Sequence, residues 1–157
     1  MIEKEELETI IPHRGKMLLL SRVNDYDLER RALRAEYHVT DDCIFYDPSA
    51  GGIPSWVAFE FMAQAISALS GIRDRTMGIK PRIGFILSIP FMQMEIPVFK
   101  LDSTVEVSVE EKDRVDLIYT FGGTAFLEGR KVIEGNLMVM ELSEEGFNKL
   151  IMEHGKN

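Results

Sequence analysis

Glu60 is the single charged residue in an otherwise apolar stretch, 54–69 (PSWVAFEFMAQAISAL). An ionised carboxylate is costly to bury alone, so such a group is usually paired, protonated or led to solvent. Two interpretations follow. Glu60 forms a structural ion pair or reaches the surface along a polar strip, or it performs acid–base chemistry in an apolar pocket. Trp56 and Gln64 lie four residues before and after Glu60, so a helix places all three on one face. Gln64 could there orient the carboxyl group or a substrate.

No pattern in the sequence indicates a metal or a nucleotide cofactor. The three histidines (His13, His38 and His154) lack metal-ligand spacing, and there is no cysteine cluster or glycine-rich phosphate loop. The lone Cys43 provides no disulfide framework and fits a reducing cytoplasm. The net charge of −8 disfavours nucleic acid as the main partner. With no apolar run of membrane-span length and no apolar signal core, neither membrane insertion nor export is expected.

Four positive charges follow the apolar stretch closely, in a segment that we expect to be a loop: Arg73, Arg75, Lys80 and Arg82. They stand out in an acidic protein. The segment is either ordinary solvated surface or a docking site for an anionic ligand or partner.

The elements that must position these residues follow from patterning. Pro54 suits the first turn of a buried helix over 54–69, and Gly71 suits the left-handed position just past its end. A short helix is expected over 2–10, and Ser143 is expected to cap a last one. Apolar runs and alternation predict strands at 17–23, 31–39, 83–89, 103–110, 115–126 and 131–142. One buried helix wrapped by a mostly antiparallel sheet, with about four late strands in a meander, satisfies this order as a single α+β domain over residues 1–157.

Several segments are similar to one bacterial family. The run from Ile10-Ile11-Pro12-His13-Arg14 through Met17-Leu18-Leu19-Leu20 to Ser21-Arg22-Val23, and the helix with Glu60-Phe61-Met62-Ala63-Gln64, resemble the 3-hydroxyacyl-acyl-carrier-protein dehydratases of the hot-dog fold. Pro97 to Asp102 is similar to the turn before that family's late strands. The 51–57 and 81–87 segments look closer to a divergent branch, the small dehydratase-like proteins of aryl polyene clusters.

The resemblance implies a fold and a chemistry. The helix would lie inside a curved sheet, and two subunits would pair their sheets. An acyl chain on a phosphopantetheine arm would enter at that interface, where a histidine and a glutamate, here Glu60, eliminate water from the 3-hydroxyacyl thioester. The amide of Ser55, at the helix start, would polarise the thioester carbonyl.

One departure from the family is plain. Its catalytic histidine falls on Tyr46 here, and no histidine lies between His38 and Glu60. An unperturbed tyrosine is a poor base near neutral pH. His13 could replace the missing base, although its counterpart in the family is commonly structural; Glu60 could act alone; or the chain could bind acyl groups without catalysis. His38 and His154 are expected to be surface residues.

We therefore expect a hot-dog dehydratase-like protein with Glu60 and His13 as catalytic candidates. Ser55, Trp56, Gln64 and Tyr46 are the candidates for substrate contact. The expected partners are an acyl carrier protein or a coenzyme A thioester, and a second subunit, identical or homologous, in a dimer or higher oligomer; no cofactor is expected. Thioester hydrolysis on the same fold and a non-catalytic acyl-binding or heterodimer subunit are the alternatives.

Overall fold

The computed structural model describes residues 1–155. In chain order the elements are β1 (Ile2–Glu3), α1 (Lys4–Leu7), the 3-10 turn η1 (Gly15–Met17), β2 (Arg22–Asp27), β3 (Ala32–His38), β4 (Gly52–Pro54), the 3-10 turn η2 (Ser55–Val57), α2 (Ala58–Thr76), β5 (Ile83–Met94), β6 (Val98–Lys100), β7 (Thr104–Val115), β8 (Ile118–Leu127), β9 (Arg130–Leu142) and α3 (Glu144–His154).

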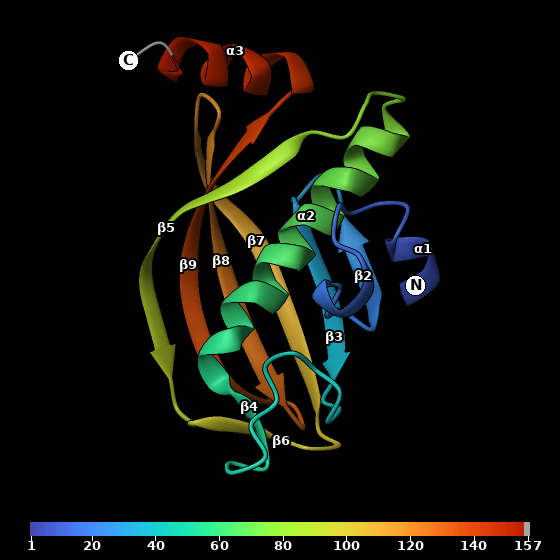
Figure 1. The fold of residues 1–157 in the computed structure, drawn as a ribbon, viewed down its shortest axis with the longest axis vertical. Coiled ribbons are helices and arrows are strands. Elements are labelled where there is room, and N and C mark those ends of the chain that lie inside the picture. Colours follow the sequence, from blue (N-terminus) through green and yellow to red (C-terminus); the bar gives the residue numbers. More distant parts are fainter. Residues whose placement is uncertain (156–157) are drawn as a thin grey trace.

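Within the described residues, seven strands form one curved antiparallel sheet around α2, in the order β1-β2-β3-β7-β8-β9-β5 (Figure 1). β4 and β6 pair separately. The predicted four-strand meander is wrong in one respect: β7, β8 and β9 follow one another, but β5 pairs with β9. β5 has no room beside β7 because β3 and β8 occupy the two edges of that strand. The result leaves the long strand β5 at the open edge of the sheet.

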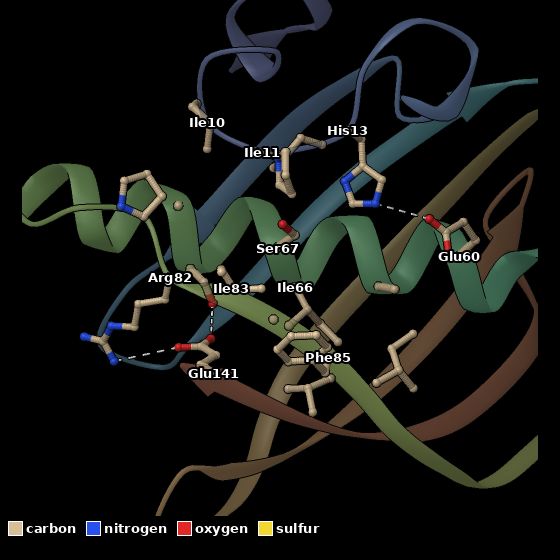
Figure 2. A pocket seen from close by; sticks show the side chains of 18 of the residues that line it. Ile10, Ile11, His13, Glu60, Ile66, Ser67, Arg82, Ile83, Phe85 and Glu141 are labelled. Carbon is tan, nitrogen blue, oxygen red and sulfur yellow. Dashed lines mark hydrogen bonds and ion pairs between the residues drawn. The ribbon is translucent and has the colours of Figure 1, made fainter. Parts of the chain in front are cut away.

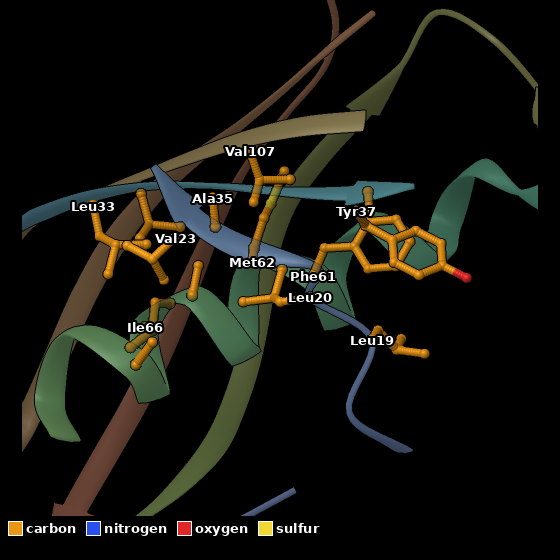
Figure 3. Packing of buried hydrophobic residues seen from close by; sticks show 14 of the residues in the cluster. Leu19, Leu20, Val23, Leu33, Ala35, Tyr37, Phe61, Met62, Ile66 and Val107 are labelled. Atoms are coloured by element: carbon orange, nitrogen blue, oxygen red, sulfur yellow. The ribbon is translucent and has the colours of Figure 1, made fainter. Parts of the chain in front are cut away.

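The core lies between α2 and the concave face of the sheet (Figure 3). The alternation predicted over 31–39 is confirmed by β3, where Leu33, Ala35 and Tyr37 are buried and their neighbours are more exposed. The Tyr37 ring packs on Phe61 of α2, with 4.8 Å between ring centroids. Apolar residues from helix and sheet thus interdigitate, which fixes the helix against the strands.

The central helix differs from the predicted one at both ends. A 3-10 turn precedes it, so Glu60 lies in the first turn of α2 rather than in its middle. At the other end the helix continues past Gly71 to Thr76. Gly71 does not terminate the helix, because its missing side chain serves another purpose. A Cβ there would collide with the carbonyl oxygen of Ile10, so glycine lets the N-terminal segment lie directly on the helix.

The N-terminal elements are shorter than predicted. The helix expected over 2–10 occupies only α1, and the strand expected over 17–23 is a 3-10 turn followed by extended chain that enters β2 at Arg22. Leu18, Leu19 and Leu20 are all buried. Consecutive burial explains the apolar run without a strand, since these residues pack beneath α2 instead of alternating across a sheet.

The C-terminal part matches the predictions more closely. Glu128 and Gly129, both with positive φ, form the turn between β8 and β9. The Ser143 hydroxyl caps α3, as predicted, by accepting the amide of Gly146 at 3.0 Å. α3 stands at one end of the molecule and contains no buried residue (Figure 1). Its Phe147 stacks on Phe85 of β5 at 5.5 Å. No helix in residues 1–155 is long and apolar enough to cross a bilayer.

Candidate active site

A pocket of about 400 Å³ runs along one face of α2 (Figure 2). Ile10 and Ile11 of the N-terminal loop line it on one side, and Ile83 and Phe85 of β5 line it on the other. The helix contributes small and apolar residues between them, including Ile66. A largely apolar channel with a few polar groups at its ends is the expected form of a small-molecule site.

His13 and Glu60 face each other at one end of this pocket (Figure 2). Nε2 of His13 lies 3.5 Å from Oε1 of Glu60, and the two side chains are 25% and 18% exposed. Nδ1 of His13 is buried and has no hydrogen-bond partner among residues 1–155, and Nε2 is the ring nitrogen that faces Glu60. The 3.5 Å separation is longer than a strong hydrogen bond, but catalytic contacts commonly tighten when substrate binds. The pair can therefore exchange protons with a bound molecule and with each other.

Gln64 fixes the position of Glu60 from behind. Its amide nitrogen donates to Oε1 of Glu60 at 2.9 Å and to the carbonyl of Met17 at 2.8 Å. Its amide oxygen accepts the backbone N–H of Leu19 at 2.9 Å and that of Leu20 at 3.4 Å. Gln64 is fully buried and does not line the pocket. Of the two predicted roles, the geometry favours orienting the carboxyl group over contacting a substrate.

The loop that carries His13 is held by its own neighbour. The Arg14 guanidinium donates to the carbonyl oxygens of Ile11 at 2.5 Å and of His13 at 2.7 Å. These bonds close a compact turn, and the bare backbone of Gly71 lets the turn rest on α2. The turn and the helix together place a loop imidazole beside a helical carboxyl group.

The predicted role of the Ser55 amide needs correction. That N–H donates to the carbonyl of Pro97 at 2.9 Å, so it is not free to polarise a thioester. The next amide of the 3-10 turn, that of Trp56, has no intrahelical acceptor because it begins a helical segment. The Val57 amide is bonded within the turn, in which each amide donates three residues back, and Val57 is fully buried.

Trp56 and Tyr46 lie outside the pocket. The Trp56 ring is 48% exposed and contacts Phe45 and Phe59, with centroids 5.9 and 6.2 Å away. Tyr46 is partly buried and packs against the core from the loop before β4. Neither residue is brought to the His13–Glu60 pair within one chain. Their predicted substrate contacts would require a different route to the substrate, such as a subunit interface.

The four basic residues do not all lie in a solvent-exposed loop, as the sequence had predicted. Arg73 and Arg75 belong to the last turns of α2. Arg73 is 14% exposed and its guanidinium bonds to Asp74 at 2.7 Å and Glu141 at 2.8 Å. Burial lowers the pKa of Arg73, but these hydrogen bonds outweigh it and raise the pKa above its ordinary value. Arg82 lies 3.7 Å from Asp74 and 3.9 Å from Glu141.

Only two of the four predicted docking residues present an exposed side chain. Arg75 is 60% exposed and lies 3.3 Å from the Glu6 carboxylate, and Lys80 is exposed. The guanidinium groups of Arg73 and Arg82 both lie within 4 Å of Asp74 and Glu141, so Arg75 and Lys80 are the more accessible members of the predicted docking set; docking itself stays a prediction.

Glu141 belongs to a buried ion network that was not among the sequence predictions. The carboxylate accepts a bond from the Ser70 hydroxyl as well as from Arg73. Arg31 lies 3.7 Å from it and bonds Glu111 at 2.8 Å. A signal was present in the sequence. Glu141 alternates in phase with the buried Leu137 and Val139 of β9, so the strand pattern already directed an acidic side chain inward.

The remaining histidines are surface residues, as predicted. Nδ1 of His38 lies 3.3 Å from the Thr104 hydroxyl, and Nδ1 of His154 lies 3.0 Å from the carbonyl of Leu150; both side chains are exposed. Across residues 1–155, no group of three or more His, Cys, Asp or Glu side chains is arranged to hold a metal ion.

Comparison with known sequences gives a family match over most of the chain. The family model described as ApeP-like (ApeP dehydratase) matches residues 5–151. The 3-hydroxyacyl-[acyl-carrier-protein] dehydratase FabZ of Haemophilus ducreyi is 31% identical over 141 residues, which span 88% of this chain and 90% of that protein.

Solved structures agree on the fold. In the dehydratase heterocomplex ApeI:P from Xenorhabdus doucetiae, one chain superposes with a TM-score of 0.83 at 22% identity, covering 92% of this chain and 96% of the other. A hypothetical thioesterase from Streptococcus pneumoniae, solved with coenzyme A, gives 0.58 at 11% identity and covers 87% and 91%. The predicted hot-dog fold, a central helix inside a curved antiparallel sheet, is confirmed.

Proposed function

Because the chain belongs to the ApeP-like dehydratase family, we propose that it eliminates water from a 3-hydroxyacyl thioester, with His13 and Glu60 transferring the protons. The observation that carries this proposal is the 3.5 Å approach of Nε2 of His13 to Oε1 of Glu60 at one end of an apolar pocket. The pair restores an imidazole–carboxyl combination in a chain whose family histidine is replaced by Tyr46.

The chemistry needs one base and one acid. Nε2 of His13 accepts the proton on C2 of the acyl chain, and the electrons of that C–H bond form the C2–C3 double bond. The C3–O bond breaks, and the hydroxyl leaves as water with a proton from the carboxylic acid form of Glu60. His13 has then gained a proton and Glu60 has lost one. Transfer from Nε2 to Glu60 returns the pair to its starting state.

Two features of the site support these roles. Gln64 donates to Oε1 of Glu60 and so holds the carboxyl group that carries the proton to the leaving hydroxyl. The amide of Trp56 lies at the start of the helical segment, where an unpaired N–H group and the helix dipole favour negative charge. It replaces the Ser55 amide as our proposed donor to the thioester carbonyl during removal of the C2 proton.

Glu60→Gln tests the proposal. Glutamine at this position can still accept the Gln64 bond, so the fold should remain, whereas its amide cannot supply a proton. Turnover of a 3-hydroxyacyl carrier-protein substrate, followed by mass spectrometry, should fall by about 10²–10⁴-fold. Activity within a few-fold of the wild type would remove Glu60 from the mechanism.

The same assay separates the alternatives by product. An enoyl thioester identifies the dehydratase, whereas a free acid identifies a thioesterase that uses Glu60 to activate water. Binding of the acyl carrier substrate by the wild type without any product would indicate a binding subunit that needs an active homologue.

We further propose that a second subunit of the same fold covers β5. This edge strand exposes large apolar side chains along its length, among them Leu87, Phe91 and Met94 at 44–47% exposure. A long apolar edge invites pairing with another strand unless it is covered. Two β5 edges would join the sheets into one. Light scattering of the chain expressed alone should give about twice its mass if identical copies suffice; a monomer that doubles in mass only with a homologous subunit would indicate a heterodimer.

The substrate is expected to arrive on the phosphopantetheine arm of an acyl carrier protein in the cytoplasm, in aryl polyene type synthesis as the family match suggests. Arg75 and Lys80, the exposed members of the predicted docking set, are the proposed contacts with this acidic partner. Attraction between exposed charges is screened over about 8 Å at physiological salt. Affinity for the carrier protein should therefore fall as salt rises, and salt-independent binding would exclude these two residues as its contacts.

A further inference from the structure

The pocket ends in a polar wall opposite the His13–Glu60 pair (Figure 2). Ser70, Arg82 and Glu141 form this wall; Ser70 donates to the Glu141 carboxylate, and Arg82 lies 3.9 Å from it. Ser70 comes ten residues after Glu60 on α2, a distance of about 15 Å along the helix. An extended chain advances about 1.2 Å per bond, so the channel accommodates roughly a dozen bonds.

Beyond this wall the molecule is hollowed again. Lys80, Ser143, Asn148 and Met152 line an open groove beside α3. Pro81 lines both the pocket and this groove. The segment 80–82 is therefore the partition between them, and a chain that passed Arg82 would continue into the groove.

The backbone of the partition does not depend on the Arg82 side chain. The Arg82 amide donates to Oδ2 of Asp74 at 3.1 Å, and the Ile79 amide donates to the Asp74 carbonyl at 3.0 Å. Neither bond involves the guanidinium group, so both would remain in a variant without it.

Two guanidinium groups face the carboxylates of this wall, and Arg82 makes the weaker contacts. Arg73 bonds Asp74 at 2.7 Å and Glu141 at 2.8 Å, whereas the contacts of Arg82 with the same carboxylates are 3.7 and 3.9 Å. Arg82 is also the more exposed guanidinium, at 28% against 14% for Arg73. Arg73 therefore holds both carboxylates more closely, whereas Arg82 adds a second, weaker contact to each and places its side chain at the end of the channel.

We propose that the Arg82 side chain, laid over Glu141, is the gate that sets the length of acyl chain the pocket accepts. This rests on the proposed function only in assuming that an acyl chain enters the pocket from the His13–Glu60 end. A chain that reaches the wall must either stop there or displace a guanidinium from two carboxylates. Apolar methylene groups cannot replace those charge contacts, so longer chains gain nothing from their extra carbons.

Calorimetric titration with non-hydrolysable acyl-pantetheine amides, lengthened in two-carbon steps, tests the gate without requiring turnover. Each buried methylene should raise the affinity of the wild type about fourfold until the chain reaches the wall, after which affinity should level off. In Arg82→Ala the rise should continue, so that the first chain beyond the wild-type limit binds roughly fifteenfold more tightly than to the wild type. Arg34→Ala removes the same charge from the exposed face of β3, outside the pocket, and should reproduce the wild-type profile.

The outcomes separate the gate from the dehydratase proposal. Identical length profiles in the wild type and in Arg82→Ala would overturn the gate, as would the absence of any acyl binding by the wild type. A shifted profile in Arg82→Ala supports the gate even if the mass-spectrometric assay finds no enoyl product, in which case only the dehydratase proposal fails. Thermal unfolding of each variant establishes that the folded protein is being titrated.

Discussion

Replacing Gln64 with leucine should weaken both the fold and the site. Leucine is close to glutamine in size but leaves the Leu19 amide and the Met17 carbonyl without their partners, in bonds that measure 2.9 and 2.8 Å. A buried polar group without a partner costs about 1–3 kcal/mol; because the Met17 bond is only partly buried, the two groups together should lower the free energy of unfolding by about 2–4 kcal/mol. Glu60 also loses the 2.9 Å bond that fixes its carboxyl group, so turnover should fall by about 10–100-fold.

Urea unfolding and the dehydration assay measure the two effects separately. For a chain of this length the stability loss corresponds to a melting temperature lowered by roughly 5–15 °C. Ser67→Ala, on the same helix and facing the pocket, is the matched control and should change stability by less than about 0.5 kcal/mol. An unfolding free energy within that same margin for Gln64→Leu would show that the four bonds of Gln64 do not form in solution.

Gln64→Glu sharpens the test because it keeps the shape and places a second carboxyl group beside Glu60. Burial raises the pKa of the introduced group above its value in the unfolded chain. A raised pKa favours the folded state at low pH, and that benefit is lost as pH rises through the folded-state value. The stability difference between this variant and the wild type should therefore be smallest near pH 4 and grow towards neutral pH.

His13→Ala should reduce turnover per folded molecule by about 10²-fold or more and leave the melting temperature nearly unchanged. Retained turnover with a lowered melting temperature would mean that His13 only stabilises its loop. Acid should destabilise the protein through Glu36 and Glu111. Burial raises the pKa of both carboxyl groups, but hydrogen bonds outweigh it and lower the pKa of each below 4.5. The donors are Asn24 and Arg22 for Glu36, and Arg114 and Arg31 for Glu111. That stabilisation is present above pH 4.5 and is lost as pH falls through the folded-state values, so Glu111→Gln should flatten the acid limb of a urea-unfolding series. Gly71→Ala should destabilise by about 1–3 kcal/mol, because the added methyl group meets a backbone carbonyl; a gain of about 1 kcal/mol, as at an ordinary helical glycine, would contradict the close packing.

Local patterns predicted the elements whose burial alternates along the chain. Residues 31–39 and 103–110 show this alternation, and both became strands with the expected faces inward. The Ser143 cap was likewise visible, because a cap depends on a few adjacent residues. Leu18 to Leu20 were different: an apolar run indicates burial but cannot distinguish a strand from chain clamped beneath a helix.

Contacts between distant segments decided what the sequence patterns missed. Gly71 was predicted to end the helix because glycine is common just past a helix C-terminus. Its actual role is to let the backbone of Ile10, which is distant in sequence, pack directly on the helix. For the site, isolation in an apolar helix singled out Glu60, whereas His13 became a candidate only because the resemblance showed the family's usual histidine to be missing; both catalytic roles stay predictions. The polar wall could not be predicted from local patterns, since Ser70 and Glu141 are 71 positions apart and meet only after the sheet has formed.

The buried ion network around Glu141 has a consequence for how the protein unfolds. It joins the β2–β3 turn at Arg31, the end of α2 at Arg73, β7 at Glu111 and β9 at Glu141. Detaching any one of these segments leaves a buried charge without its partner, which costs about 3–5 kcal/mol. Partly opened forms are thus penalised selectively. Amides around all four positions should exchange with solvent together, at the rate of global unfolding, while those of α3, which has no buried residue, exchange far sooner.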